Sequence, residues 1–568
     1  MQADSWVTFD IEADDFVRGL TKVACICTMD QDGEEKIWHD DPRFFSHGSI
    51  DDGVRYLRSA ELLVAHNGQG YDLPALAKLG WEIDVPIFDT MVISRLIFPD
   101  LRDKDWQDKA MPRDLKGRHS LRAWGHRLKC AKGDEDVSGG VHEVTQSVLD
   151  YCQQDVRVND KLYRKLAAIP YSQDAIDLEM PFAKRLNEMS LRGVHFFEDR
   201  HADLTKELMG RRADLDVKID GAFEPWTVEM KTKTKVVPFN PNSRDQIAKR
   251  FIEKYGWKPT VFTETGKPKV DETVLADLNY PEAVLLSEGM MLTKRLGQVA
   301  EGAQAWQNFV EDGRLYGGII HNGTVTSRCA HFNPNLGQVP AVRKEYGVAC
   351  RSCFGAPPGL SFIGWDASGL ELRMLAHFMA DDDFIDVLLN GDIHTRNMEA
   401  LGIDNRDLAK TWIYAFLYGA GDKRLAKLLG IGLKAARDLR ASFLAKTPKL
   451  KQLIGNVKAV SKRGWLKGLD GRRVPVRMEH AALNTLLQAA GAVVMKKAVV
   501  QGCDYIEPLG GRMVLYVHDE VQAEGPDDRA EEIGAAGCRG VVDAGLHFNL
   551  RVPLAAEYKV GNDWAQTH

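Results

Sequence analysis

The chain has 568 residues, of which 44% are hydrophobic and 27% charged, and its formal net charge is −7. This length and balance predict a globular protein of three or four domains and exclude a disordered chain. The acidic total argues weakly against nucleic-acid binding, although DNA responds to local clusters of charge and not to the sum. No signal peptide or membrane-length apolar segment is apparent, so we expect a cytoplasmic protein with no membrane partner.

The nine cysteines show neither disulfide-like nor zinc-like spacing. Cys350 and Cys353 have half of a zinc spacing, but no second pair of cysteines or histidines stands at a suitable distance. We expect them to be ordinary buried thiols in a reducing compartment.

Residues 1 to about 165 alternate strand-like and helix-like segments, which predicts an α/β domain. The expected strands are 6–11 and 62–65, and the expected helices are 73–79 and 148–166. Residues 178–310 are mostly helical in period, with a Lys/Thr/Pro-rich interruption at 231–242. From about 314 to the end, strands alternate with long helices.

The first strand carries two carboxylates on one face. Apolar and polar residues alternate through Val-Thr-Phe-Asp-Ile-Glu at 7–12, and a period of two places Asp10 and Glu12 on the same side. Adjacent carboxylates repel each other unless a proton or a cation bridges them. Taken alone, the pattern is more typical of a polar face at a sheet edge.

Three further residues could join these carboxylates. Asp72 follows a Gly-rich turn, and Pro74 predicts that a helix begins there, where Asp72 could also be only an N-cap. Tyr151 and Asp155 are four residues apart in a helical segment and share a face, although they could be incidental neighbours.

Together these four acids and one tyrosine resemble the DnaQ-like proofreading exonucleases of the DEDD type, in the tyrosine subtype. The resemblance implies an RNase H-like 3′→5′ exonuclease domain in which the acids bind two Mg²⁺ or Mn²⁺ ions. One ion would generate hydroxide, the other would stabilise the leaving 3′-oxygen, and Tyr151 would orient the attacking water.

Carboxylates recur in the C-terminal half. An apolar strand over 362–366 ends at Asp366, where Ser368 and Glu371 fit a capping box, so Glu371 could be only a helix cap. Downstream, the segment His518-Asp519-Glu520 interrupts an apolar strand and predicts a hairpin with carboxylates at its tip. A solvated turn is the alternative.

A helix between these segments carries an ordered stripe. Arg406, Lys410, Tyr414 and Tyr418 recur every fourth residue and share one face. A cation near a helix N-terminus opposes the macrodipole, but it suits phosphate binding beside free backbone amides. The aromatic end suits base stacking. A plain amphipathic helix is the alternative.

These segments resemble motifs A, B and C of family A DNA polymerases, above all their phage replicative branch. Further similar segments follow in the family's order at 327–328, 335–338, 391–395, 468–472 and 483–488. The resemblance implies a right-hand polymerase over residues 171–568, after an exonuclease over 1–170. The thumb would span about 200–310, the palm about 311–383 and 476–568, and the fingers about 384–475.

The resemblance also assigns the polymerase chemistry. Asp366 and Asp519, with the Ala367 carbonyl, would bind two catalytic Mg²⁺ or Mn²⁺ ions while the primer 3′-hydroxyl attacks the α-phosphate and pyrophosphate leaves. His394 and Arg406 would hold the triphosphate.

Lys410 would hold the triphosphate too and would protonate the pyrophosphate. Glu371 would contact Tyr414 and exclude ribonucleotides. The tyrosine at 414, where relatives carry phenylalanine, implies tolerance of dideoxynucleotides.

Five residues would contact the DNA. Arg328 and Gln488 would donate to the minor-groove acceptors of the new base pair, which are similar for every correct pair. Tyr418 would stack near the templating base. His518 and Glu520 would support the primer terminus, and Glu520 would also be one of the catalytic residues. The serine at 327 stands where relatives usually have glycine, which affects the pose of Arg328.

Two basic groups are candidates for phosphate contacts by the thumb and by the palm–fingers junction, although such groups are more often solvated faces. They are Lys231, Lys233, Lys235, Arg244, Lys249, Arg250 and Lys254, and Lys462, Arg463, Lys467, Arg472, Arg473 and Arg477.

The expected partners are primer–template DNA and dNTPs, with a phage helicase–primase and a single-strand-binding protein as further replication partners. Phage relatives insert a large basic thumb loop that binds thioredoxin, but only the short segment 221–238 stands there, so we expect no thioredoxin clamp. We expect no 5′-nuclease domain before the exonuclease, which would favour a replicase. The rival hypotheses are a 3′→5′ exonuclease whose polymerase half only binds DNA, and a non-catalytic DNA-binding scaffold.

Overall fold

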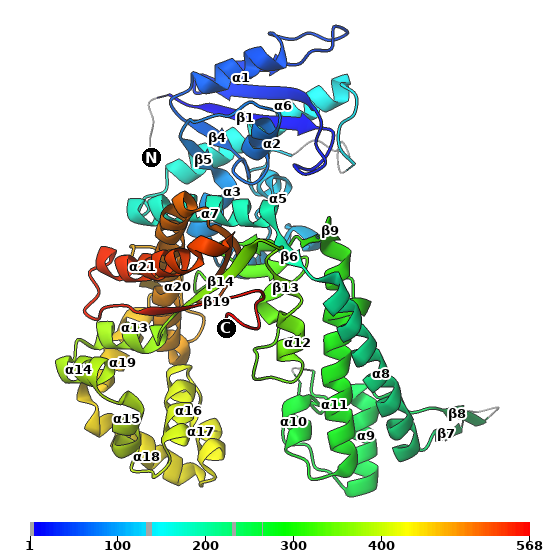
Figure 1. Ribbon diagram of the computed structural model, residues 1–568, viewed down its shortest axis with the longest axis vertical. Coiled ribbons are helices and arrows are strands. Elements are labelled where there is room, and N and C mark those ends of the chain that lie inside the picture. Colours follow the sequence, from blue (N-terminus) through cyan, green and yellow to red (C-terminus); the bar gives the residue numbers. More distant parts are fainter. Residues whose placement is uncertain (1–4, 132–138, 230–233, 264) are drawn as a thin grey trace.

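The computed structural model describes residues 5–131, 139–229, 234–263 and 265–568. It has three tiers: an α/β layer at the top, a sheet-centred layer in the middle, and two groups of helices that extend below it on opposite sides (Figure 1). Among the described helices, none is both long enough and apolar enough to cross a bilayer.

The top tier is a five-stranded sheet in the order β3-β2-β1-β4-β5. Strand β1 pairs antiparallel with β2 and parallel with β4. The strands are β1 (Val7–Ala13), β2 (Val23–Asp30), β3 (Glu35–Trp38), β4 (Leu63–Ala65) and β5 (Ile87–Asp89). The helices are α1 (Ile50–Arg58), α2 (Asp72–Lys78), α3 (Thr90–Ile97), α4 (Leu101–Gln107), α5 (Leu121–Arg127) and α6 (Gln146–Ala167).

Helices cover both faces of this sheet, and the alternation of β1 decides which residues meet which helix. Phe9 and Ile11 join a core with residues of α1 and α2, such as Val54 and Leu76. The opposite face lies under α6, which contacts both β1 and β2. The period of two therefore directs Asp10 and Glu12 toward α6, and the predicted strand is confirmed.

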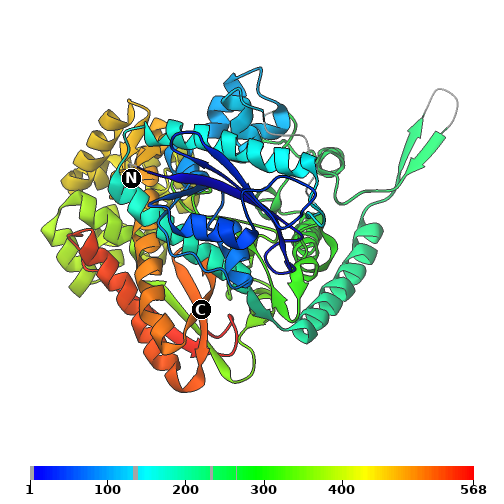
Figure 2. The ribbon, with the colours of Figure 1, turned by 90° about the horizontal axis from the view of Figure 1, so that it is seen from above.

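Helix α7 (Gln173–Arg192) leads into the first helical group. Its helices are α8 (Glu198–Ala222), α9 (Arg244–Tyr255), α10 (Glu272–Ala276) and α11 (Pro281–Leu296). The expected interruption of helical period is a β-hairpin of β7 (Trp226–Glu229) and β8 (Thr234–Val237), which projects away from the molecule (Figures 1 and 2). Residues Lys231 and Lys233 of the predicted basic group lie outside the described residues.

The middle tier is built on a sheet in the order β17-β18-β14-β19. Its strands are β14 (Leu360–Ala367), β17 (Arg512–Val517), β18 (Glu520–Pro526) and β19 (Ala556–Gly561). A smaller sheet, in the order β13-β6-β10-β9, and the hairpin β11–β12 adjoin it. These are β6 (Val194–Phe196), β9 (Val310–Glu311), β10 (Arg314–Leu315), β11 (Gly318–Ile320), β12 (Ala330–Phe332) and β13 (Phe354–Gly355), near helix α12 (Gly347–Arg351).

Two long helices, α20 (Ala482–Ile506) and α21 (Ala530–His547), pack on each other beside this sheet. Helix α20 is apolar on nearly all sides because it lies within the largest core of the described chain. The two helices approach closely where glycines meet: a Cβ at Gly540 would lie 2.7 Å from the Gly502 nitrogen.

The second helical group joins the sheet through α13 (Leu370–Met379) and returns to it through α20. Within it Trp412 stacks on Phe416, and Phe443 meets both rings edge-on, with ring centroids 5.3–5.9 Å apart. Its elements are α14 (Asp382–Asn390), α15 (Ile393–Leu401), α16 (Arg406–Leu417), α17 (Asp422–Leu429), α18 (Leu433–Lys446), α19 (Pro448–Ser461), β15 (Trp465–Lys467) and β16 (Arg473–Pro475).

Candidate active sites

Strand pairing brings the C-terminal carboxylates together. Asp366 lies opposite Glu520 in the β14–β18 ladder, and the amide of Ala367 donates to the Asp519 carbonyl at 3.3 Å. Asp366, Ala367 and Asp519 line one cavity, which they share with His518. The predicted hairpin tip therefore lines a cavity and is not only a solvated turn.

Burial, together with the charges of Asp519 and Glu520, raises the pKa of Asp366 to about 7. Two carboxylates in this position repel each other, and a divalent cation between them would relieve the repulsion. Carboxylate and carbonyl oxygens are also the donors that hard divalent ions prefer. The residues present therefore fit Mg²⁺ or Mn²⁺.

Glu520 is directed into a buried network behind the cavity. Its carboxylate accepts from Gln522 Nε2 at 2.6 Å, from the Trp564 indole and from His568, and lies 3.4 Å from the Arg351 guanidinium. Burial opposes ionisation of Glu520, but these hydrogen bonds and charges outweigh it and lower the pKa. The carboxylate thus acts on Asp366 through its charge.

Glu371 is not a helix cap, and its hydrogen-bond partner differs from the predicted one. Helix α13 begins after Gly369, which has φ 59° and provides no side-chain cap, so the alternative in which Glu371 only forms a capping box with Ser368 does not hold. In addition, Glu371 accepts a hydrogen bond from Tyr418, one turn beyond Tyr414. Its other oxygen lies 3.4 Å from the Arg328 guanidinium. Glu371 therefore links the helix after β14 to the end of α16.

The turn before Arg328 contains a left-handed residue. Ser327 has φ 64° and is buried, which fits a position that glycine occupies without strain. The amides of Gly323 and Thr324 donate to the Arg328 carbonyl at 3.0 and 3.2 Å. Arg328 thus stands on a short, internally bonded turn between β11 and β12, beside the carboxylate cavity.

The predicted stripe on α16 forms as expected. Tyr414 and Tyr418 stack with centroids 6.3 Å apart and line the carboxylate cavity. Burial, and then the charges of Lys410 and Arg406, lower the pKa of His394, so the three groups form one basic cluster.

Arg406 is bonded to Asp392, which also caps α15. The Arg406 Nε donates to Asp392 Oδ2 at 2.6 Å, and the Asp392 carboxylate accepts from the amides of His394 and Thr395.

Gln488 is half-buried on α20. It lies one turn before Gly491, and Gly491 lines a neighbouring cavity together with Arg328.

The N-terminal acids converge on β1. Asp72 begins α2, is buried, and accepts from the Ile11 amide at 3.3 Å. Burial raises its pKa to about 7. Asp10 and Glu12 lie together with Cys152 of α6, and their ligand atoms are all within 4.8 Å of one another.

Tyr151 and Asp155 are both buried on α6, the helix that covers this face of β1. The five predicted residues therefore belong to β1 and to two elements that each contact it: Asp72 of α2 bonds to the β1 backbone, and α6, which carries Tyr151 and Asp155, packs on β1. Cys152 stands between Tyr151 and Asp155, and its position in the sequence gave no sign that it belongs with them.

The predicted phosphate-binding group at 462–477 is wrong at one position. Arg472 is fully buried, and its guanidinium pairs with Asp470 at 2.6 Å and with Glu179 of α7 at 2.9 Å. Arg477 pairs with Asp103 of the N-terminal tier at 2.9 Å. The members Lys462, Arg463, Lys467 and Arg473 remain exposed.

Some members of the first basic group, at 235–254, also have partners within the protein. Lys254 bonds to Glu282, Lys249 lies 3.7 Å from Glu253, and Arg250 packs over Trp226. Lys235 is exposed on β8, and Arg244 is exposed at the start of α9.

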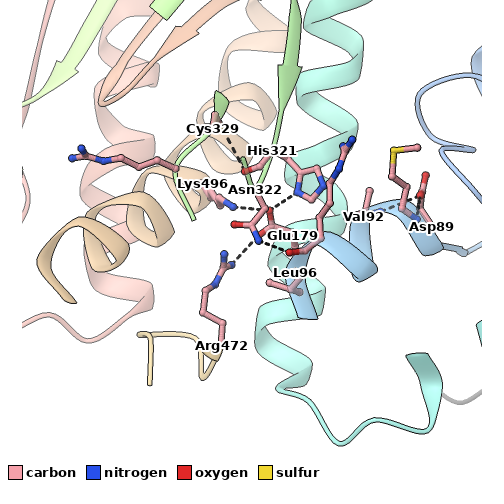
Figure 3. A network of polar contacts seen from close by, with 12 residues as sticks. Asp89, Val92, Leu96, Glu179, His321, Asn322, Cys329, Arg472 and Lys496 are labelled. Atoms are coloured by element: carbon pink, nitrogen blue, oxygen red, sulfur yellow. Dashed lines mark hydrogen bonds and ion pairs between the residues drawn. The ribbon is translucent and has the colours of Figure 1, made fainter. Parts of the chain in front are cut away.

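A buried ion cluster joins four segments of the chain (Figure 3), and its member Lys496 also lines the cavity that neighbours the carboxylate cavity. The Glu179 carboxylate accepts from Lys496 Nζ at 2.5 Å and from His321 Nδ1 at 2.6 Å, and it pairs with Arg472. Burial lowers the pKa of His321 to about 4, so this imidazole is neutral at pH 7 and donates through Nδ1.

His321 stands at the start of the turn that carries Arg328, and the neighbouring Asn322 donates to the Arg95 carbonyl of α3 at 2.8 Å. The cluster and this bond fix the turn against α7, α20 and the N-terminal tier.

The chain is similar to known proteins over nearly its whole length. The model of DNA polymerase family A matches residues 212–566. The DNA-directed DNA polymerase of Escherichia phage T7 is 33% identical over 99% of this chain and 100% of its own length. DNA polymerase I of Chloroflexus aurantiacus is 28% identical over 88% of this chain and 54% of its own length.

A solved structure shares the fold. The POL domain of Pol1 from M. smegmatis, in complex with DNA primer-template and dNTP, superposes with a TM-score of 0.79 over 99% of this chain and 96% of that one, at 20% identity. The matched family model and the near full-length phage relative together assign the family: this chain belongs to DNA polymerase family A.

Proposed function

We propose that the chain extends a DNA primer with dNTPs at the Asp366–Asp519 cavity, and that residues 1–170 form a 3′→5′ proofreading exonuclease. Family membership establishes the DNA polymerase activity. The pairing of β14 with β18, which puts Asp366 beside Asp519 in a cavity that Tyr414 and Tyr418 also line, is the observation that carries the assignment of residues.

The two helical groups on either side of the β17-β18-β14-β19 sheet support a right-hand division of residues 171–568 (Figure 1). The first group would be the thumb, at about 200–310, and the second the fingers, at about 384–475. The sheet and its long helices would be the palm, at about 311–383 and 476–568.

Family A DNA polymerases depend on metal ions, and we propose Mg²⁺, two ions per site, with Mn²⁺ able to substitute. Asp366, Asp519 and the Ala367 carbonyl would hold them in the polymerase. The bound ions would supply positive charge at the reacting phosphate and promote ionisation of the attacking hydroxyl or water. Asp10, Glu12, Asp72 and Asp155 would hold them in the exonuclease.

The basic cluster on α15 and α16 would bind the triphosphate. His394, Arg406 and Lys410 each present an N–H group that can donate a hydrogen bond to a phosphate oxygen. Arg406 would exchange Asp392 for phosphate, which costs little because that ion pair is exposed. Lys410, exposed one turn further along α16, would donate a proton to the leaving pyrophosphate.

Glu371 would close the sugar side of the nucleotide pocket. Its hydrogen bond from Tyr418 holds the carboxylate near Tyr414, where it would crowd a ribose 2′-hydroxyl. The Tyr414 phenol would replace a missing 3′-hydroxyl contact, which favours acceptance of dideoxynucleotides. Tyr418 would change partner when the templating base stacks on it.

Contacts to the DNA would test the shape of the new pair. Arg328 and Gln488 would donate to its minor-groove acceptors, which are similar for every correct pair. His518 would lie against the primer terminus, while Glu520 would position Asp366 and Asp519 from behind. In the exonuclease, Tyr151 would orient the attacking water.

Two substitutions separate the proposed activities. Asp366→Ala should abolish primer extension and leave single-strand digestion intact, while Asp10→Ala should do the reverse; both activities are measured with Mg²⁺ on labelled DNA. Asp527→Ala is the control, because Asp527 bonds to Ser361 at the opposite end of β14 and should change neither activity.

The rival hypothesis of an exonuclease with a polymerase half that only binds DNA predicts no extension by the wild-type chain. Loss of digestion in Asp366→Ala would instead show that the two sites are assigned to the wrong domains.

A further inference from the structure

Three cysteines meet beside the proposed exonuclease carboxylates. Cys25 and Cys27 lie on β2 and Cys152 lies on α6, and each is at most 1% exposed. Their sulfur atoms are all within 4.8 Å of one another. The sequence shows no zinc-type spacing because these residues approach only when α6 packs on the sheet.

The register of the sheet makes the thiols and the carboxylates one continuous surface. In the antiparallel β1–β2 ladder, Asp10 is opposite Cys27 and Glu12 is opposite Cys25. Residues directly opposite each other point to the same face of a sheet, and here that face lies under α6.

Cys152 belongs to both sets of donors. Its sulfur lies 3.8 Å from the Asp10 carboxylate and 3.5 Å from the Asp10 carbonyl. Asp10, Glu12 and Cys152 form a second triplet whose ligand atoms are within 4.8 Å of one another. An ion among the thiols would therefore lie next to the place where the hydrolytic ions are proposed.

The donor types differ in the ions that they favour. Thiolates bind borderline and soft ions such as Zn²⁺ and Cd²⁺, whereas Mg²⁺ requires oxygen ligands. Tetrahedral zinc with Zn–S bonds of about 2.3 Å places its sulfurs roughly 3.8 Å apart, which the observed sulfur separations allow. Three thiolates and one carboxylate carry the same formal charge as a four-cysteine zinc site.

We propose that Cys25, Cys27 and Cys152 form a binding site for a soft or borderline divalent cation, with the Asp10 carboxylate as fourth ligand. Binding releases the three thiol protons to solvent. It also withdraws Asp10 from the Mg²⁺ site, so occupancy represses 3′→5′ hydrolysis and leaves primer extension unchanged. This repression rests on the exonuclease function proposed above, but the binding itself does not.

Cadmium titration of the reduced full-length chain tests the binding. We expect one Cd²⁺ per chain with thiolate-to-metal charge-transfer absorption in the ultraviolet. Cys152→Ser should weaken binding more than about 100-fold, since losing even an outer-shell partner costs about 10–100-fold. Cys503→Ser is the matched control, a buried cysteine of α20 that should leave the titration unchanged.

Zinc inhibition tests the coupling. In excess Mg²⁺, added Zn²⁺ should inhibit digestion by the wild-type chain and by Cys503→Ser at least tenfold more strongly than digestion by Cys152→Ser. Absence of the thiolate absorption, or its persistence in Cys152→Ser, overturns the site. Absorption without any Mg²⁺-dependent digestion overturns the exonuclease and retains the binding site.

Discussion

At the residue scale, Ser327 carries backbone strain next to a residue with a proposed DNA contact. A left-handed conformation costs a non-glycine residue about 1–2 kcal/mol, and glycine avoids this cost but loses more chain entropy on folding, about 0.5–1 kcal/mol. Ser327→Gly should therefore raise the free energy of unfolding by between zero and about 1.5 kcal/mol.

The comparison variant for this position is Ser327→Val, because a β-branched side chain is least compatible with φ 64°. It should destabilise the chain in urea unfolding and weaken primer binding by moving Arg328. Equal stability of the valine and glycine variants would show that the turn relaxes out of the left-handed region.

The Glu179 cluster shows how strongly burial changes the value of an ion pair. Glu179 and Lys496 are fully buried, so Glu179→Gln leaves the Lys496 ammonium without a compensating charge. Removing one partner of a buried pair costs about 3–5 kcal/mol. We expect a loss of that size in denaturant unfolding, with reduced primer-extension rate because His321 no longer fixes the Arg328 turn.

An exposed ion pair between the same two halves of the chain is the control for Glu179. Arg477 and Asp103 are about half exposed and 2.9 Å apart. Such pairs contribute less than about 1 kcal/mol, so Asp103→Asn should barely change stability. If both variants lost the same stability, burial would not be the reason for the effect at Glu179.

At the scale of elements, the contact between α20 and α21 depends on the absence of side chains. A Cβ at Gly540 would lie 2.7 Å from the Gly502 nitrogen, a backbone atom that cannot rotate away. Gly540→Ala should therefore separate the helices and cost about 1–3 kcal/mol, as overpacking commonly does. Thermal unfolding would measure the change.

Gly455 offers the opposite case within a helix. It lies inside α19, and no atom stands within 4 Å of a Cβ placed there. Gly455→Ala should raise the free energy of unfolding by about 0.5–1 kcal/mol because alanine favours the helix. Urea unfolding of the two chains would measure the difference, and a loss of stability in the variant would mean that helix propensity does not govern this position.

Local patterns predicted the elements that carry most of the candidate sites. Alternation gave the β1 face with Asp10 and Glu12, and the four-residue period gave the stripe on α16. What local patterns could not give were partners from distant segments. The burial of Arg472 depends on Glu179 of α7, which lies far away in the chain, and basic residues in exposed and buried settings look alike in sequence.

Two other features were also not apparent from local patterns. Glu371 fits the pattern of a capping box, but Gly369 adopts a left-handed conformation that starts the helix without one. The thiol cluster depends on packing of α6 against β2, so Cys25 and Cys152 could not be associated from their spacing.

At the scale of the whole molecule, the hairpin β7–β8 stands where the resemblance to the phage replicative branch implies a large thumb insertion. The alignment with the phage T7 polymerase spans 709 positions and so is longer than this chain of 568 residues. The T7 protein must therefore carry insertions relative to this one. Between α8 and α9, this chain has only the segment 223–243, with its hairpin.

We therefore expect thioredoxin to have no effect on this polymerase. Two short strands offer far less surface than a stable protein interface, which buries about 800 Å² on each partner. Primer extension on a long single-stranded template, under conditions in which each enzyme binds once, should give the same product lengths with and without thioredoxin. The phage T7 polymerase, assayed in parallel, is the comparison. A thioredoxin-dependent increase in product length that disappears when the hairpin is replaced by a Gly–Ser turn would refute the prediction and locate the binding surface.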